Sequence, residues 1–94
     1  MPIRPEDFPF GFAPDQRKLA ETFVANRQAE LIENGPDDAR VRIKIFKKTL
    51  EAFAERKPGG VFRSDCDCPH FENEGTGCAH LFAMCLLVQK AAEA

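Results

Sequence analysis

The segment CDCPHFENEGTGCAH, residues 66–80, contains three of the four cysteines of the chain and both of its histidines. A chain of 94 residues has a small core, and small domains often need a disulfide, a metal or a partner chain for stability. This cluster of thiol and imidazole groups could form a metal site, a redox pair, a disulfide or a catalytic centre. The spacing of the residues and the compartment of the protein decide among these possibilities.

The first residues, MPIRPEDFPF, include acidic residues and no apolar run, so we expect no secretory signal peptide. No stretch of about eighteen apolar residues occurs, so we expect no transmembrane helix and no membrane partner. The sequence therefore predicts a cytoplasmic or nucleoid-associated protein. In a reducing compartment, clustered cysteines bind metal or take part in catalysis more often than they form disulfides.

The spacing of the cysteines favours a metal site. Cys66 and Cys68 are two residues apart, so their side chains point to the same side of an extended segment. Cys78 and His80 repeat that spacing where a helix is expected to begin, and the positive end of a helix favours a thiolate. Three thiolates and one imidazole describe a closed, tetrahedral site for one structural zinc ion. A disulfide between neighbours so close would be a very tight ring, and redox pairs more often have two residues between their cysteines.

Other assignments within this region stay open. His70 is an alternative to His80 as the imidazole ligand, and iron–sulfur or redox chemistry is an alternative to zinc. Cys85 lies in an apolar helical stretch, where a free cysteine is expected to be a small buried hydrophobe. A catalytic zinc keeps an open position, whereas four ligands are available here, and no nucleophile–base pair accompanies Glu72 or Glu74. We therefore expect a protein that is not an enzyme.

The ligand pattern resembles a SWIM-type zinc finger, whose signature is Cys-x-Cys, a variable gap and then Cys-x-His. Pro69, Phe71 and an apolar run with Ala83 also resemble the family, and the resemblance covers about residues 59–88. It implies a β-β-α finger that contacts DNA or other proteins in nucleic-acid-processing machinery. The chain departs from the family at Ala79, where a lysine is frequent. The resemblance implies four zinc ligands: Cys66, Cys68, Cys78 and His80.

The formal net charge of −2 conceals a segregation of charge along the chain. Residues 1–39 and residues 64–94 each have a balance of −4, whereas residues 40–63 have a balance of +6. Nucleic-acid-binding proteins usually carry such a basic patch, although the same residues could instead pair with acidic neighbours. The predicted nucleic-acid contacts are Arg40, Arg42, Lys44, Lys47, Lys48 and Arg63.

The sequence of residues 1–57 predicts an extended arm followed by helices. Residues 1–14 hold four prolines, so an extended arm is expected, whose phenylalanines either complete the core or dock on a partner. A helix is expected from Asp15 to about Glu33. Within residues 37–57, basic and apolar residues alternate in RVRIKIF, as in a strand, whereas KKTLEAFAERK has the propensity of a helix. We expect one long helix here, with Phe46 on its apolar face. The predicted partner-binding residues in the arm are Phe8, Phe10 and Phe12.

These observations predict one domain of the α+β class, rich in helix. It comprises the arm, a helical part at residues 15–57 and a SWIM-like finger at residues 58–94, with a strand at residues 61–66 and a core helix from about residue 76. The expected function is a non-enzymatic zinc module that binds DNA or RNA, or that acts within a nucleic-acid-processing complex. The alternative is an adaptor or inhibitor that docks on a protein of such a machine, or on a second copy of itself, without touching nucleic acid.

Overall fold

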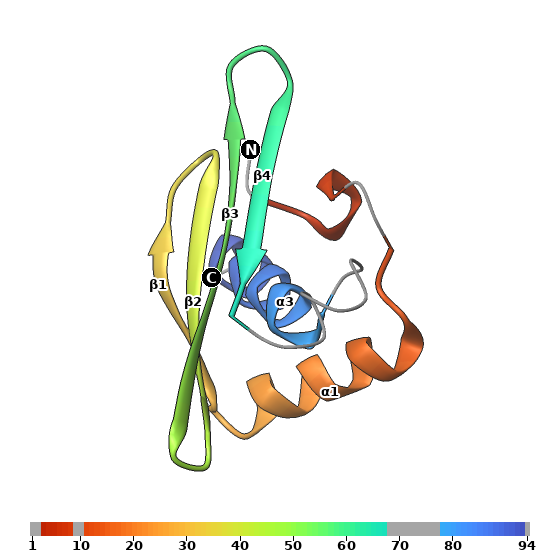
Figure 1. The fold of residues 1–94 in the computed structure, drawn as a ribbon, viewed down its shortest axis with the longest axis vertical. Coiled ribbons are helices and arrows are strands. Elements are labelled where there is room, and N and C mark those ends of the chain that lie inside the picture. The colour runs from red at the N-terminus through yellow and green to blue at the C-terminus, as the bar shows by residue number, and fades with distance from the viewer. Residues whose placement is uncertain (1–2, 9–10, 68–77, 94) are drawn as a thin grey trace.

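A computed structural model describes residues 3–8, 11–67 and 78–93 of the chain (Figure 1). The helices in this part are a short 3-10 helix, η1 (Pro5–Asp7), and two α-helices, α1 (Pro14–Ala25) and α3 (Ala79–Glu93). The strands are β1 (Ala29–Asn34), β2 (Asp38–Ile45), β3 (Lys48–Lys57) and β4 (Val61–Cys66).

The four strands form one antiparallel sheet in the order β1-β2-β3-β4, so each strand pairs with its neighbour in the chain. Helix α3 packs on one face of this sheet, and α1 packs against α3 (Figure 1). Neither helix covers the other face, which is a common arrangement for an antiparallel sheet. The covered face holds the core and positions the cysteines and histidine.

Alternation along the strands explains why the sheet buries one face. In β2, Ala39, Val41 and Ile43 are buried on the covered face, while the basic residues between them lie on the other face. In β3, Ala52 and Ala54 are buried in the same way. Small alanine side chains on the central strands leave room for α3 to lie close to the sheet.

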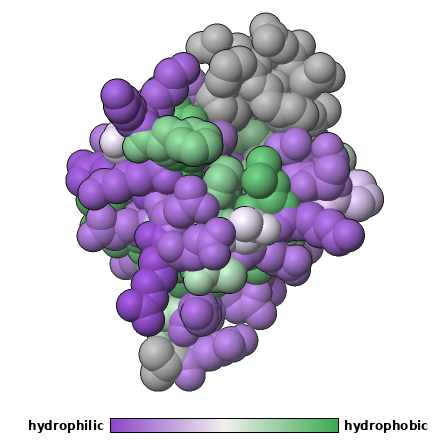
Figure 2. Space-filling model, turned by 90° about the horizontal axis from the view of Figure 1, so that it is seen from below, coloured by the Kyte–Doolittle hydropathy of each residue, from purple (hydrophilic) through white to green (hydrophobic). Residues whose placement is uncertain are grey.

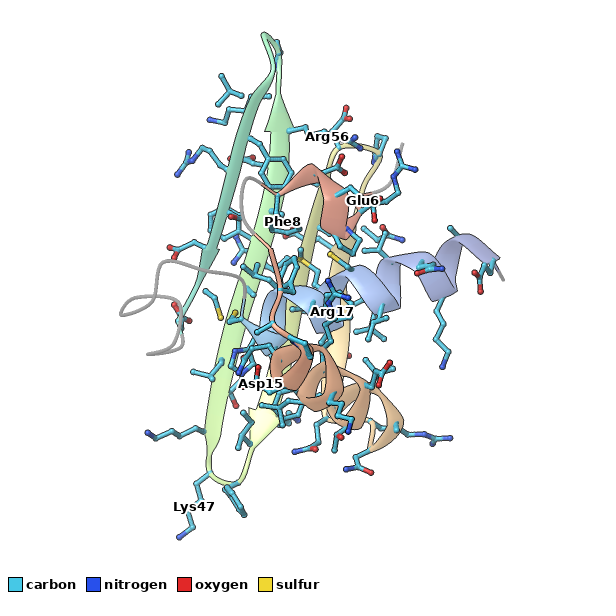
Figure 3. All side chains as sticks on the ribbon, turned by 90° about the vertical axis from the view of Figure 1, so that its right-hand side faces the viewer. Glu6, Phe8, Asp15, Arg17, Lys47 and Arg56 are labelled. Atoms are coloured by element: carbon cyan, nitrogen blue, oxygen red, sulfur yellow. The ribbon has the colours of Figure 1, made fainter. Side chains whose placement is uncertain are left out.

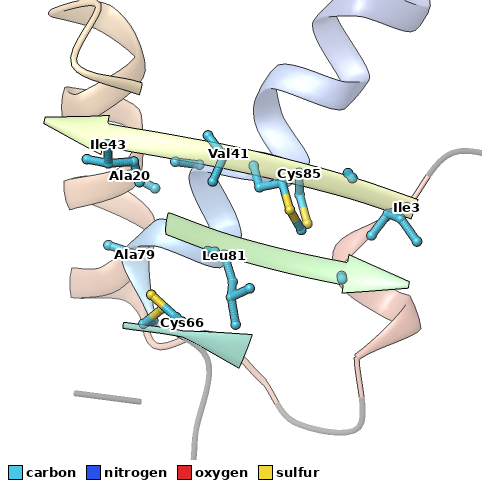
Figure 4. Close-up of a cluster of buried hydrophobic side chains, with 14 of the residues drawn as sticks. Ile3, Ala20, Val41, Ile43, Cys66, Ala79, Leu81 and Cys85 are labelled. Carbon is cyan, nitrogen blue, oxygen red and sulfur yellow. The ribbon is translucent and has the colours of Figure 1, made fainter. Parts of the chain in front are cut away.

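The core lies between the sheet, the two α-helices and the N-terminal arm (Figure 4). Helix α3 supplies more buried residues than any other element, which confirms the prediction of a core helix in the last part of the chain. Its buried residues are Ala79, His80, Leu81, Ala83, Met84, Cys85 and Val88. Helix α1 adds Ala20 and Phe23.

The arm lies on the body of this chain. Phe8 and Phe12 are buried, with ring centroids 5.4 Å apart in an edge-to-face arrangement. The ring of Phe8 also meets Phe62 of β4 at 4.9 Å, and the ring of Phe12 meets Phe82 of α3 at 5.2 Å. Phe10 lies outside the described residues. The arm therefore adds aromatic surface to a core that is small for a single domain.

The prediction of a helix-rich fold is wrong, because helices and strands contain about equal numbers of the described residues. Helix α1 ends at Ala25 instead of near Glu33. Arg27 there adopts a left-handed conformation with φ of 58°, and the N–H of Gln28 donates to the carbonyl of Phe23 at 2.9 Å. This is the Schellman arrangement that closes helix C-termini, and it turns the chain into β1.

The long helix favoured for residues 37–57 is also wrong, since this segment forms β2 and β3. The helical propensity of KKTLEAFAERK is a local preference, which pairing along the whole length of β2 and β3 overrides. The predicted strand at residues 61–66 is confirmed as β4. A turn at residues 58–60 joins β3 to β4, with Gly59 and Gly60 at φ of 85° and 80°.

Candidate metal site

Three side chains from the cysteine-rich segment meet where β4 ends and α3 begins. Cys66 is the last residue of β4, Cys78 directly precedes α3, and His80 is in the first turn of that helix. Their ligand atoms all lie within 4.8 Å of one another, and Sγ of Cys66 is 3.4 Å from Nδ1 of His80. Zinc bonds of about 2.0–2.3 Å in a tetrahedron place ligand atoms roughly 3.3–3.8 Å apart. The three side chains therefore lie close enough to hold one metal ion.

The site is buried, which determines its electrostatics. Cys66, Cys78 and His80 are 3%, 0% and 8% exposed. A hydrogen bond from Cys66 lowers the pKa of the Cys78 thiol, and His80 lowers it further, although burial acts in the opposite direction. A buried thiolate is unfavourable unless a cation compensates its charge. The donor set therefore fits a soft or borderline metal cation such as Zn²⁺.

Helix α1 supports the histidine. The ring of Phe23 is stacked on the imidazole of His80, with centroids 5.5 Å apart and an interplanar angle of 11°. Nδ1 of His80 faces Cys66, whereas its Nε2 is buried and has no hydrogen-bond partner among the described residues. The backbone N–H of Ala79 donates to Oε1 of Gln16 at 3.0 Å. These contacts fix both the ring and the helix terminus that carry the ligands.

The structure brings together three of the four predicted zinc ligands. Cys68, the predicted fourth ligand, and His70, the alternative imidazole, lie outside the described residues. Cys85 is not part of this group: it is buried in the core, and burial raises the pKa of its thiol to about 12, whereas the pKa of Cys78 is lowered. Such a thiol is protonated at neutral pH, which agrees with a structural role.

The predicted nucleic-acid contacts fall into two groups, and the first is paired with acids on the uncovered face of the sheet. Arg40 is 3.3 Å from Glu51, Arg42 is 3.7 Å from Glu51, and Arg63 is 3.6 Å from Glu55. These pairs follow the register, which sets Arg42 opposite Glu51 and Arg63 opposite Glu55. Much of the charge of these arginines is therefore balanced within the sheet.

The second group lies at the turn between β2 and β3. Lys44, Lys47 and Lys48 are exposed there and form no ion pair with a described residue. Lys47 points away from the body of the molecule (Figure 3). Phe46, expected in an apolar seam, is instead fully exposed within this turn. The alternation of basic and apolar residues, which stops at Ile45, is the sequence signal that could have located the turn.

Comparisons with known proteins add no relative: no family model, no curated protein and no solved structure matches the chain. The resemblance to SWIM-type fingers therefore rests on the ligand pattern and its flanking residues. None of the helices in the described part of the chain has the length and apolar character needed to span a membrane.

Proposed function

We propose that this chain is a non-enzymatic module in which one structural zinc ion joins α3 to the sheet and a basic turn binds nucleic acid. In this proposal Cys66, Cys78 and His80 bind the ion, and Cys68 is the fourth ligand, as in the SWIM-type pattern. The module would act on DNA or RNA directly, or within a complex that processes nucleic acid.

The proposed role of the metal rests on where its ligands come from. One ligand ends β4, one directly precedes α3 and one lies in the first turn of α3, so the ion would connect the sheet to the helix that contributes the largest share of the core. Structural zinc contributes about 10–16 kcal/mol of apparent binding free energy in zinc-finger peptides. A whole domain has a net stability of only about 5–15 kcal/mol. The burial of all three ligands supports a structural ion, because a substrate would need access to the metal.

One observation carries the nucleic-acid part of the proposal: three exposed lysines lie in and next to the β2–β3 turn, without acidic partners among the described residues. Residues 39–50 contain five basic residues and no acidic residue. The arginines among them are balanced by Glu33 and Glu51, so the uncompensated charge belongs to Lys44, Lys47 and Lys48. A cluster of free ammonium groups on a projecting turn suits the phosphate backbone, whereas the net charge of the whole chain is negative.

The test is the salt dependence of oligonucleotide binding. Three phosphate contacts predict that log K falls with log salt concentration at a slope of about −2 to −3. Replacement of Lys44, Lys47 and Lys48 by glutamine should remove most of this slope and weaken binding at least about tenfold. The matched control replaces Lys18 and Lys90, which are exposed on α1 and α3, and should leave binding unchanged. The proposal fails if the zinc-loaded protein binds neither DNA nor RNA, or if binding is insensitive to salt.

The alternative, an adaptor that docks on a protein through its aromatic arm, has less support. Phe8 and Phe12 are 6% exposed and pack against Phe62 and Phe82 of the same chain. Docking through these rings would first require the arm to leave the core, which would expose several aromatic side chains to water.

A further inference from the structure

The turn between β2 and β3 contains an aromatic residue whose placement the fold does not explain. Phe46 is 102% exposed, and its φ of 55° lies in the left-handed region. Bulky residues rarely adopt this conformation, which glycine, asparagine and aspartate tolerate best. The turn between β3 and β4 follows that rule, because Gly59 and Gly60 occupy its positive-φ positions. Phe46 thus combines an unfavourable backbone conformation with a ring fully in water.

The surroundings of Phe46 are cationic. Lys47 and Lys48 follow it directly, and Lys44 precedes it by two residues. Arg27 is the other non-glycine residue with a positive φ in the described part of the chain. It lies at the same end of the sheet, because the N–H of Lys44 donates to the carbonyl of Gln28, the residue after Arg27, at 2.9 Å. Arg27, Arg42 and Lys44 line one shallow hollow beside the turn, together with Glu30.

The shape of this end of the molecule agrees with a contact site. The β2–β3 turn projects beyond the helices, and Lys47 extends from its tip (Figures 1 and 3). Viewed from this end, the surface is mainly hydrophilic, with separate hydrophobic areas (Figure 2). Among residues 44–49, Phe46 is the one exposed apolar side chain.

We propose that the β2–β3 turn binds unpaired bases, with the ring of Phe46 stacked on one base and the adjacent lysines on the flanking phosphates. This inference rests on the proposed function and names its substrate class, single-stranded or locally unpaired DNA or RNA. In a duplex the faces of internal bases are covered by their neighbours, so an aromatic ring can stack only where a base is unpaired or terminal. Stacking of this kind is tolerant of sequence, because every base has a π-face.

An anionic membrane surface is the competing ligand for an aromatic ring among lysines. Insertion into lipid depends on the apolar area that is buried, and stable membrane anchoring needs more than one contribution, such as an acyl chain together with a basic patch. At this turn a single exposed ring stands among three ammonium groups, which gives little apolar area. The pairing of one flat ring with several point charges corresponds more closely to the alternation of base and phosphate in a nucleic-acid strand.

The test compares single-stranded and duplex oligonucleotides of equal length, by anisotropy, with the zinc-loaded protein and a Phe46→Asn variant. Asparagine tolerates the left-handed conformation, so this variant should fold and melt at a higher temperature than the parent. It should bind the single strand about tenfold more weakly than the parent does, and its affinity for the duplex should equal that of the parent. The control is Leu19→Asn, which replaces another exposed apolar side chain, on α1, and should leave binding unchanged.

A second variant gives a direct readout of stacking. The chain contains no tryptophan, so Phe46→Trp introduces a single fluorescent reporter at the turn. A single-stranded oligonucleotide should quench this fluorescence, and it should bind the Phe46→Trp variant at least as tightly as it binds the parent. The inference is overturned if Phe46→Asn binds the single strand like the parent, or if phosphatidylserine vesicles but not oligonucleotides change the fluorescence. If the lysine variant loses binding while Phe46→Asn keeps it, only the stacking inference fails; if no oligonucleotide binds, the proposed function fails as well.

Discussion

The side-chain oxygen Oε1 of Gln16 accepts a hydrogen bond of 3.0 Å from the backbone N–H of Ala79, the residue between Cys78 and His80. The first N–H groups of a helix have no partner within that helix and are usually capped by a nearby side chain. Here the partner comes from α1, 63 residues earlier in the chain. Helix α3, which carries His80 and directly follows Cys78, is therefore tied at its first residue to a separate element, in addition to the stacking of Phe23 on His80.

We predict that Gln16→Ala lowers the free energy of unfolding by about 1 kcal/mol, because a partly buried N–H loses its acceptor. For a domain of this size that change corresponds to a melting temperature lower by about 4–8 °C. Zinc affinity should fall in parallel, since the cap orders the backbone between two ligands. Gln89→Ala, on the exposed part of α3, is the control and should change neither quantity. Equal melting temperatures for the Gln16→Ala variant and the parent would refute the prediction.

The second prediction concerns the metal itself. The purified protein should contain one zinc ion per chain, and a strong chelator should unfold at least residues 60–94, because the binding free energy of structural zinc is comparable with the stability of a whole domain. Cys78→Ser should remove the metal and produce the same loss of structure. Metal analysis and circular dichroism measure these outcomes. A Cys78→Ser variant that melts normally without metal would show that the site is not a structural metal site.

Variants outside the cluster test the assignment of individual ligands. Cys85→Ala should keep one zinc ion per chain, since Cys85 is a core residue with a protonated thiol. Cys68→Ser should lose tight binding and His70→Gln should keep it, if Cys68 is the fourth ligand. Cobalt substitution can report the number of thiolates through the intensity of the sulfur-to-metal absorption band. A band unchanged by Cys68→Ser would assign the fourth position to another residue.

The grouping of Cys66, Cys78 and His80 was predictable because its signal is local. Cys66, Cys78 and His80 lie within fifteen residues, and the expected helix start at Cys78 places two of them at one helix terminus. Burial of the ligands follows from the apolar start of the last helix. The contribution of α1 was not predictable, because no pattern connects Gln16 or Phe23 with residues some 60 positions later.

The sheet was missed because its strands are stabilised by neighbours that a local pattern does not show. KKTLEAFAERK has helical propensity, but Glu51, Phe53 and Glu55 alternate with alanines that face α3. The segment NGP, residues 34–36, ends β1 and not the helix, since Arg27 had already closed the helix. An arginine carries no recognisable stop signal, unlike a glycine in that position.

A further prediction concerns Arg56, which connects the arm to the sheet (Figure 3). Its guanidinium is 3.6 Å from Asp7 of η1 and 3.6 Å from Asp37 in the β1–β2 turn, and it donates to the carbonyl of Pro36 at 3.2 Å. Arg56→Met should lower the free energy of unfolding by about 1–3 kcal/mol, because it leaves the carboxylate of Asp7, which is 20% exposed, without this cationic partner.

Arg63→Met is the matched control for that variant. Arg63 also forms an ion pair from a strand of the same sheet, with Glu55 at 3.6 Å, but its side chain is 58% exposed. Exposed pairs contribute little, so urea denaturation should show a change below about 1 kcal/mol. Similar losses of stability for the two variants would indicate that the arm does not depend on Arg56.

The last prediction is the response of stability to alkaline pH. Burial, reinforced by the carboxylates of Asp7 and Glu6, raises the pKa of Cys85 from 9.0 to about 12. Below pH 9 this thiol is protonated in both the folded and the unfolded chain, so it adds no pH dependence. Between pH 9 and about 12 it ionises only in the unfolded chain, so stability should fall by up to about 1.4 kcal/mol per pH unit. In urea denaturation of the zinc-loaded protein at pH 8 to 11, Cys85→Ala should lose less stability over this range than the parent. Parallel pH profiles for the two proteins would exclude a buried, protonated Cys85 as the source of alkaline sensitivity.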